Sequence, residues 1–204
     1  MKPQKSVNLM MVLTLLTGWL AWLPAPVQAQ SSFDCSTVTG MPQIECEALV
    51  AIYEATDGDN WRDNTRWLQT STPCDWFGVR CETGHVTELG LALNHLRGDL
   101  PSEISNLTAL TFLQLGDDLA SLPSEISNLT ALTYLQLDGN NFTSLPSELW
   151  NLPALKTLSL ESCDLTSLPS ELWNLTSLTS LYLSDNNLTS LPPEIGNLTA
   201  LAKL

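Results

Sequence analysis

Residues 132–152 read L-T-Y-L-Q-L-D-G-N-N-F-T-S-L-P-S-E-L-W-N-L, and this pattern returns along most of the chain. Its common form is L-x-x-L-x-L-x-x-N-x-L, followed by x-x-L-P-x-E-I/L-x-N-L. The units begin at Val86, Leu110, Leu132, Leu155 and Leu178, and a sixth breaks off after residues 201–204. The five full units are 24, 22, 23, 23 and 23 residues long. Self-similarity at this period predicts a solenoid, in which each unit contacts its neighbours.

The leucine spacing is that of a leucine-rich repeat. We expect the central L-x-L of each unit to form a short strand that stacks in parallel on the next unit. The rest of each unit would return on the convex side and close the core. The predicted fold class is an α/β repeat solenoid, a right-handed horseshoe with short parallel strands on its concave face. Residues 85–204 form this repeat region, and residues 30–84 form an N-terminal cap.

The N-terminus has the features of a secretory signal. Lys2 and Lys5 precede an apolar run over residues 9–23, and residues 27–29 (V-Q-A) form a small-residue cleavage site. A membrane-anchoring helix is the alternative, but the run is short for one and prolines follow it at once. Residues 1–29 are therefore predicted to be a signal peptide, with no membrane insertion after cleavage. The chain would be secreted and extracellular, or in the periplasm or on the cell surface of a bacterium.

The charge balance excludes two classes of partner. The chain has 8 basic and 22 acidic residues, a formal net charge of −14. Removal of Lys2 and Lys5 with the signal peptide would change −14 to −16. Nucleic acid and anionic lipid both require clustered lysine and arginine, so neither is an expected partner.

The cap is expected to contain one helix and two disulfides. Residues 44–56 have the apolar spacing of an amphipathic helix, and Trp61, Trp67 and Trp76 follow it with large apolar surfaces. Four cysteines in a secreted cap allow three pairings, and their spacing favours Cys35 with Cys46 and Cys74 with Cys81. A zinc site is the weaker alternative, because the cysteines lack C-x-x-C spacing.

Residues 73–81 (P-C-D-W-F-G-V-R-C) and the following H-V-T-E-L resemble the N-terminal cap of plant-type extracellular leucine-rich repeat proteins. These include receptor-kinase ectodomains and polygalacturonase-inhibiting proteins. The first repeat, with N-H-L-R-G-D-L-P at 94–101, is similar to the plant unit, and secreted bacterial proteins resemble residues 45–53. The later repeats read T-S-L-P without the plant glycine. The resemblance implies that the residue after each strand turns inward and satisfies backbone groups; these residues are Asn94, Asp117, Asn140, Cys163 and Asn186.

No set of residues suggests catalysis. His85 and His95 have no nucleophile at a motif spacing, and Cys163 is interpreted as a buried free thiol of the repeat. No phosphate-binding loop or zinc-protease motif is present. Residues 57–60 (D-G-D-N) start like a calcium loop, but the glutamate that such a loop needs is missing. The chain is predicted to be no enzyme and to have no cofactor and no metal site.

The variable positions of the strands carry the predicted binding site on the concave face. Aromatic residues framed by polar ones suit protein and glycan recognition alike. The predicted ligand-binding residues are Phe112, Tyr134, Gln136, Asp138, Glu161 and Tyr182. The simpler alternative is a solvated sheet face, since strands favour aromatic residues anyway.

Two further contact surfaces are expected. Trp150 and Trp173 occupy the same position of two adjacent repeats. This position is predicted to face solvent on the convex flank, where the two rings would form a second contact surface. Packing of the two rings against each other and the neighbouring turns is the alternative. The C-terminal edge has no polar capping repeat, which suggests weak protection there and end-to-end self-association.

These observations predict a secreted, non-enzymatic binding module that recognises a protein or a cell-surface glycan through its concave face. The alternative function is a structural or adhesive spacer in a longer surface protein.

Overall fold

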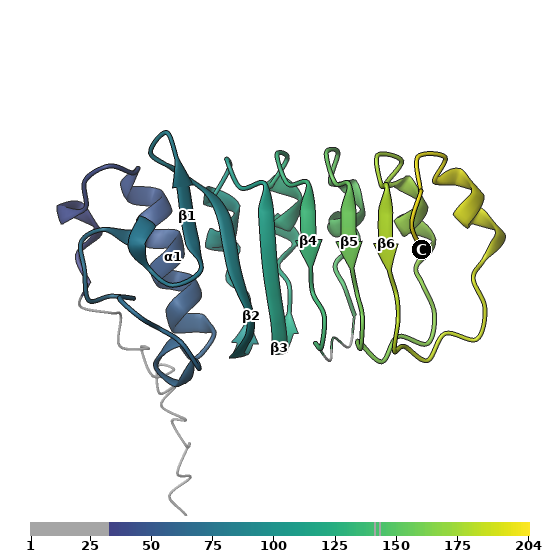
Figure 1. The fold of residues 1–204 in the computed structure, drawn as a ribbon, viewed down its shortest axis with the longest axis horizontal. Helices are drawn as coiled ribbons and strands as arrows, with labels where there is room; N and C mark the ends of the chain where they lie inside the picture. Colours follow the sequence, from purple (N-terminus) through teal and green to yellow (C-terminus); the bar gives the residue numbers. More distant parts are fainter. Residues whose placement is uncertain (1–32, 141, 143) are drawn as a thin grey trace, which may run out of the picture. The chain divides into compact units, whose positions relative to one another are not determined.

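The structure is a computed structural model that describes residues 33–140, 142 and 144–204. The predicted signal peptide therefore lies outside the described residues. Within them, one sheet contains six strands in sequence order: β1 (Val79–Glu82), β2 (His85–Asp99), β3 (Phe112–Ser121), β4 (Tyr134–Gln136), β5 (Thr157–Ser159) and β6 (Ser180–Tyr182). β1 is antiparallel to β2, and all later pairs are parallel (Figure 1). One parallel strand per repeat confirms the predicted solenoid.

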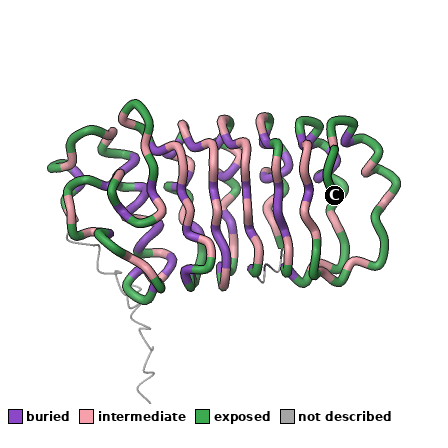
Figure 2. Tube along the Cα trace, viewed as in Figure 1, coloured by how far each residue is buried: buried purple, intermediate pink, exposed green. Residues whose placement is uncertain are grey.

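Each repeat returns behind the sheet through a 3-10 helix (Figure 1). These helices are η4 (Ser102–Asn106), η5 (Ser124–Asn128), η6 (Ser147–Asn151), η7 (Ser170–Asn174) and η8 (Pro193–Asn197). A proline in extended conformation precedes each one and a glutamate occupies each first turn. The carboxylate suits the partial positive charge of exposed N–H groups there. In Figure 2 the buried positions lie along the strands and along the helices behind them; most of them are leucines.

The cap contains the predicted helix and both predicted disulfides. Helix α1 (Gln43–Ala55) agrees with the expected 44–56 within one residue at each end. The short 3-10 helices η1 (Cys35–Thr37), η2 (Gly58–Asn60) and η3 (Pro73–Asp75) complete the cap. Disulfides join Cys35 to Cys46 and Cys74 to Cys81, as predicted. The rings of Tyr53, Trp61, Trp67 and Trp76 form a continuous aromatic cluster that covers the end of the repeat stack.

Buried polar contacts join the cap to the first repeat. The Glu45 carboxylate on α1 is 2% exposed, accepts the Val86 N–H at 2.8 Å and lies 2.6 Å from Nδ1 of His85. Asn94 accepts the Asp63 N–H and donates to the carbonyl of the same residue. These bonds satisfy backbone groups that burial would otherwise leave without a partner. The cap and the repeats are therefore parts of one compact unit.

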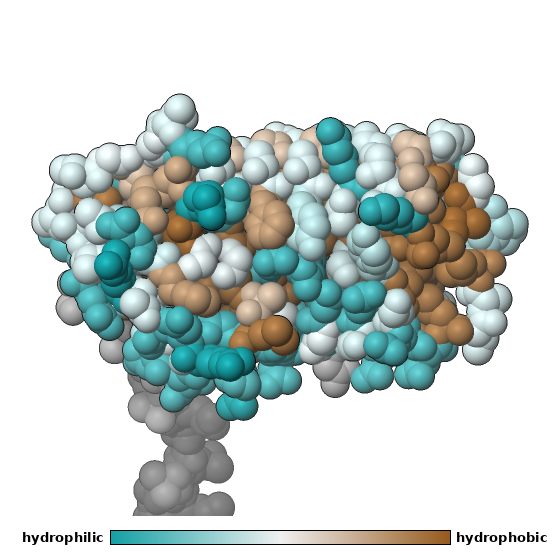
Figure 3. All heavy atoms as spheres, viewed as in Figure 1, coloured by the Kyte–Doolittle hydropathy of each residue, from teal (hydrophilic) through white to brown (hydrophobic). Residues whose placement is uncertain are grey.

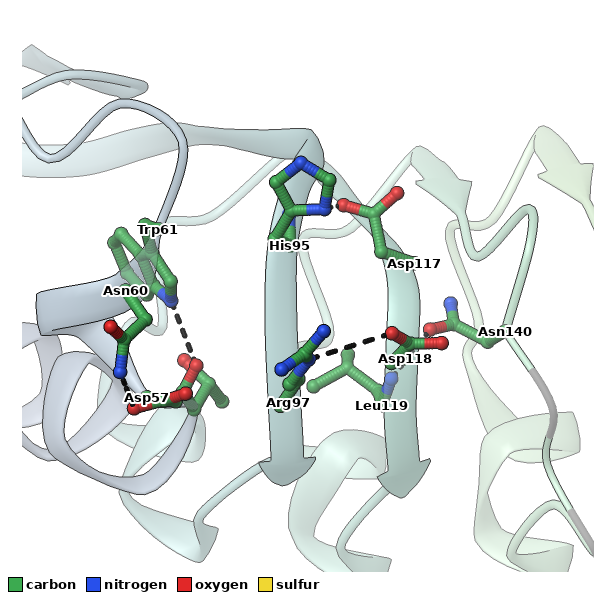
Figure 4. A network of polar contacts seen from close by, with 10 residues as sticks. Asp57, Asn60, Trp61, His95, Arg97, Asp117, Asp118, Leu119 and Asn140 are labelled. Carbon is green, nitrogen blue, oxygen red and sulfur yellow. Dashed lines mark hydrogen bonds and ion pairs between the residues drawn. The ribbon is translucent and has the colours of Figure 1, made fainter.

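The inward-turning residues after the strands behave as the family resemblance implies, with one exception. Asn140 and Asn186 each bond backbone groups of their own and the preceding repeat. Asp117 is an exception only in part: it accepts the backbone N–H of His95 in the preceding repeat, as implied, but it is half-buried and not turned fully inward. Asp117 has a φ of 92°, and β3 continues beyond it to pair with β2 again. In Figure 4 the adjacent Asp118 forms an ion pair with Arg97, while Asn140 reaches the Leu119 N–H.

Apolar burial decreases after β6. Leu183, Ile195 and Leu201 are half-buried, whereas their counterparts in inner repeats, such as Leu137 and Leu172, are fully buried. Apolar side chains gather at this end of the face shown in Figure 3. Among the described residues, no helix is long and apolar enough to cross a membrane.

Candidate binding site on the sheet face

The in-register strands bring together side chains that are distant in sequence. Tyr134 on β4 pairs with Thr157 on β5, and Thr157 pairs with Ser180 on β6. Two residues further along, Gln136, Ser159 and Tyr182 form the next row. We call the surface that carries these side chains the sheet face; it is the face predicted to be concave. Parallel register therefore produces the side-by-side arrangement that the repeat alignment predicted.

An open pocket of about 360 Å³ lies on the sheet face over β4, β5 and β6. Five of the six predicted ligand-binding residues line it: Tyr134, Gln136, Asp138, Glu161 and Tyr182. Thr157, Ser159, Ser180 and Lys203 complete its lining. Small residues on β5 leave a trough between the larger side chains of β4 and β6. Phe112, the sixth predicted residue, is absent from the lining and supports the pocket from outside.

The β4 wall of the pocket is held by contacts within the sheet face. The Phe112 and Tyr134 rings stack with centroids 4.5 Å apart and an angle of 14° between planes. Oε1 of Gln136 accepts hydrogen bonds from Gln114 Nε2 at 2.6 Å and from the Tyr134 hydroxyl at 3.0 Å. These contacts fix the Gln136 side chain and leave its own amide N–H groups for a ligand. A wall arranged in advance loses less entropy when a ligand binds.

Ser159 is the functional candidate that sequence analysis did not select. Its side chain is on β5, the residue is only 4% exposed, and it lines the pocket. Within the described residues, no hydrogen bond to its hydroxyl is found. The only buried side-chain nitrogen or oxygen without a partner in the described residues is Thr87 Oγ1, so the Ser159 hydroxyl itself reaches the open pocket, where it is available to a ligand. The signal was present in the alignment, where a small residue falls between Gln136 and Tyr182 on adjacent strands.

The two ends of the pocket differ in charge. Asp138 and Glu161 lie at the end of the strands, where Oδ1 of Asp138 accepts the Glu161 N–H at 2.9 Å. In the described part of the chain neither carboxylate is in an ion pair. Lys203 forms an isolated β-bridge with Ser180 on β6. It therefore lies at the end of the pocket opposite to the two carboxylates. The pocket thus offers uncompensated negative charge at one end and an ammonium group at the other.

The aromatic residues of the site are less accessible than predicted. Phe112, Tyr134 and Tyr182 are half-buried, not exposed, because stacking and the neighbouring strands cover part of each ring. The part of Tyr134 and of Tyr182 that stays accessible still lines the pocket.

The prediction of a second contact surface at Trp150 and Trp173 is wrong. These residues are 2% and 4% exposed, and both belong to the hydrophobic core. Each directly follows a buried leucine on a 3-10 helix, and stacking of η6 and η7 covers the rings. The alternative is packing of the two rings against each other and the neighbouring turns; the burial agrees with packing against the turns, whereas among the described residues no ring contact joins Trp150 to Trp173. Trp150 also borders a separate pocket of about 350 Å³, whose lining is mixed: Phe142 and Leu165 on one hand, Ser144, Asp164 and Thr166 on the other.

Cys163 is a buried free thiol, as predicted. Its Sγ donates to the carbonyls of Leu137 at 3.2 Å and Glu161 at 3.3 Å. Burial raises the pKa of the thiol, and the charge of Asp138 acts in the same direction. The thiol form therefore dominates at neutral pH, which is unsuited to nucleophilic attack. Across the described residues, no three metal-ligating side chains come together.

Comparison with known proteins places these features in context. Residues 124–204 match the leucine-rich repeat region family. Over 69 residues, 33% of this chain, the sequence is 41% identical to a probable inactive receptor kinase of Arabidopsis thaliana, 10% of which is matched. The chain thus spans about a tenth of the length of that curated relative.

Solved structures show the same architecture. The leucine-rich repeat ectodomain of the receptor kinase SOBIR1 from Arabidopsis thaliana gives a TM-score of 0.60 at 23% identity, over 80% of this chain and 91% of that chain. The Arabidopsis receptor kinase HAESA, in complex with the peptide hormone IDA and the co-receptor SERK1, gives 0.53 at 27% identity, over 78% and 33%. Residues 124–204 thus match leucine-rich repeats by sequence, and the described residues fold as a capped solenoid similar to the ectodomains of plant receptor kinases.

Proposed function

We propose that the protein is a secreted, non-enzymatic binding module that holds a segment of another protein on its sheet face. The observation that carries this proposal is the pocket over β4–β6, which is lined by side chains from three adjacent repeats. Such a surface suits an extended peptide, because the rows of side chains run across the strands and continue from one repeat to the next. The peptide hormone bound to HAESA supports a ligand of this class.

Secretion is supported by the two cap disulfides, since disulfides persist in oxidising compartments. The predicted signal peptide 1–29 agrees with this localisation. Receptor-kinase ectodomains, which this chain resembles, are extracellular parts of their proteins.

A direct test compares alanine variants on the two faces once a peptide ligand has been selected. Tyr182→Ala and Glu161→Ala should each weaken binding, by about 2 kcal/mol where the side chain is a central anchor. The control is Glu171→Ala on η7, an exposed carboxylate on the opposite face. Isothermal titration calorimetry would measure all three. Affinity lost only in the control variant would refute binding on the sheet face.

A cell-surface glycan is the competing ligand for the same pocket, because sugar rings also stack on tyrosine and bond to carboxylates. A glycan array probed with the same variants distinguishes it from a peptide.

The second function to be tested is a structural or adhesive role, favoured by the apolar surface after β6. Leu191 is 41% and Leu204 63% exposed there. End-to-end self-association through this edge would give a concentration-dependent mass in analytical ultracentrifugation, and Leu191→Glu would reduce it. A constant monomer mass would leave only the binding role.

A further inference from the structure

We infer that the trough over β5 is a specificity pocket for an arginine side chain of the bound peptide. The inference rests on the proposed function and adds the chemistry of the group that the pocket recognises. It follows from three observations: two carboxylates without a cation partner, a serine side chain that is largely buried but whose hydroxyl, without a protein hydrogen bond in the described residues, opens onto the pocket, and a tyrosine beside them.

The carboxylates set the charge of the recognised group. Asp138 and Glu161 line the same end of the pocket, and within the described residues no lysine or arginine forms an ion pair with either. The backbone bond from Glu161 N–H to Asp138 keeps one of these side chains in place. Ionised carboxylates only accept hydrogen bonds. A ligand group at this end must therefore be a donor, and a cationic donor forms the stronger bonds.

To bond the Ser159 hydroxyl as well, the cationic group of the ligand must reach the bottom of the trough. Ser159 is the last residue of β5, and Glu161 follows two residues later in the turn, within about 6.7 Å along the backbone. An arginine has five N–H donors on a flat fork, so one group can serve the carboxylates and the hydroxyl together. A lysine ammonium is a compact charge and covers fewer of these acceptors.

The width of the trough suits a flat side chain. Gln136 and Tyr182 flank Ser159 on neighbouring strands, so their backbones are about 10 Å apart, or two strand spacings. Side chains on both walls narrow this gap to a slot. A guanidinium can lie flat in such a slot against the Tyr182 ring, where a cation and an aromatic face attract each other.

Gln136 can bind the peptide backbone next to the arginine. Its carbonyl oxygen already accepts two hydrogen bonds, so its remaining capacity is to donate through the amide nitrogen. A peptide carbonyl is the matching acceptor. Lys203, at the opposite end of the rows, adds a second donor for carbonyl or carboxylate groups of the same peptide.

The test uses the immobilised protein and four libraries of short, end-capped peptides with randomised flanks. Their central residue is arginine, citrulline, lysine or glutamate; citrulline has the size and shape of arginine without the charge. Retained peptides are quantified by mass spectrometry at low and high salt. We expect the arginine library to be retained about tenfold more than the citrulline library, because bonds to charged groups are the stronger class. This preference should decrease at high salt.

Variants assign the preference to the pocket. Glu161→Gln and Ser159→Ala should reduce the ratio of arginine to citrulline, whereas Glu171→Gln on η7 should leave it unchanged. Thermal unfolding of each variant confirms that the fold is retained. Tyr182→Leu keeps an apolar side chain and tests the ring itself.

The outcomes separate the two proposals. Equal retention of arginine and citrulline peptides that still depends on Tyr182 overturns the arginine pocket and leaves peptide binding in place. Retention that no sheet-face variant changes overturns both proposals. If the protein retains neither the arginine nor the citrulline peptides, and instead binds glycans in a way that depends on Tyr182 and Glu161, then the ligand of the pocket is a glycan and not a peptide.

Discussion

Replacement of Asn140 by alanine tests how the solenoid satisfies the backbone between repeats. Asn140 is 1% exposed and makes three hydrogen bonds. Its Oδ1 accepts the Leu119 N–H at 3.0 Å, and its Nδ2 donates to the carbonyls of Leu115 at 3.3 Å and Leu137 at 2.9 Å. Alanine removes all three bonds and leaves the Leu119 N–H buried without an acceptor.

The magnitude follows from these contacts. A hydrogen bond contributes about 0.5–1.5 kcal/mol net, and a buried group left without a partner costs more. The Leu137 carbonyl keeps a weak partner in the Cys163 thiol, which reduces the loss. We therefore expect Asn140→Ala to lower the free energy of unfolding by about 2–4 kcal/mol. The midpoint of thermal unfolding should fall by about 4–16 °C for a domain of this size.

The assay is thermal and urea unfolding followed by circular dichroism, with Asn128→Ala as matched control. Asn128 is an exposed asparagine at the end of η5, and its replacement should change stability by less than about 0.5 kcal/mol. If Asn140→Ala costs no more than this control, the inward-turning asparagine does not stabilise the solenoid and the argument fails.

The reciprocal change at Cys163 sharpens the test. Asn186 accepts the N–H groups of residues 23 and 21 positions earlier, Cys163 and Leu165. By the same register, Cys163→Asn would supply an acceptor to the N–H groups of Asn140 and Phe142. It should be neutral or stabilise by about 1 kcal/mol. A loss as large as that of Asn140→Ala would show that this position selects for size, not for hydrogen bonding.

Further predictions concern packing, pH, the free thiol and local stability. Trp173→Ala should lower the free energy of unfolding by about 3–5 kcal/mol in urea titration, because the ring is buried; a cost below about 1 kcal/mol would contradict its core position. Burial, with the hydrogen bond to Asp59, raises the pKa of Tyr53 to about 12. The folded-state pKa thus exceeds the unfolded value of 10, so this stabilisation is complete below pH 10 and is lost as the pH rises from about 10 to about 12. Tyr53→Phe should make the midpoint of thermal unfolding less dependent on pH in that window, and an unchanged dependence would refute the assignment. Cys163 should react with a thiol reagent at neutral pH only after unfolding; fast labelling of the native protein would place the thiol at the surface. Amide hydrogen exchange should be faster beyond Leu178, where core leucines are half-buried, and protection equal to that of α1 in a monomer would disprove this.

Much of the fold was predictable because the repeat is periodic. The spacing of leucines defines which side chains lie inside, and parallel stacking follows once each unit has one strand. The cap helix agreed within one residue at each end, and both disulfides connect cysteines that are close in sequence. Local spacing is enough for such features, since each depends on neighbours within one or two units.

Features that depend on contacts between units were not predictable in the same way. Trp150 and Trp173 occupy a slot that is polar or glycine in the other repeats, and the pattern indicated an exposed position. In the fold, two adjacent 3-10 helices enclose the rings, so burial is decided by what stacks beside the slot. Asp117 likewise departs from its neighbours, because the shortened repeat places the positive φ on this residue and extends β3.

The candidate site shows the same division. The sequence by itself determined which side chains face away from the core, since alternation along a strand places Tyr134, Gln136 and Tyr182 on the side opposite the leucines. Only the tertiary structure decided that they enclose a pocket. The trough exists because small residues on β5, among them Ser159, lie between large ones on β4 and β6. Volume and accessibility arise from neighbours across strands, which no single repeat encodes.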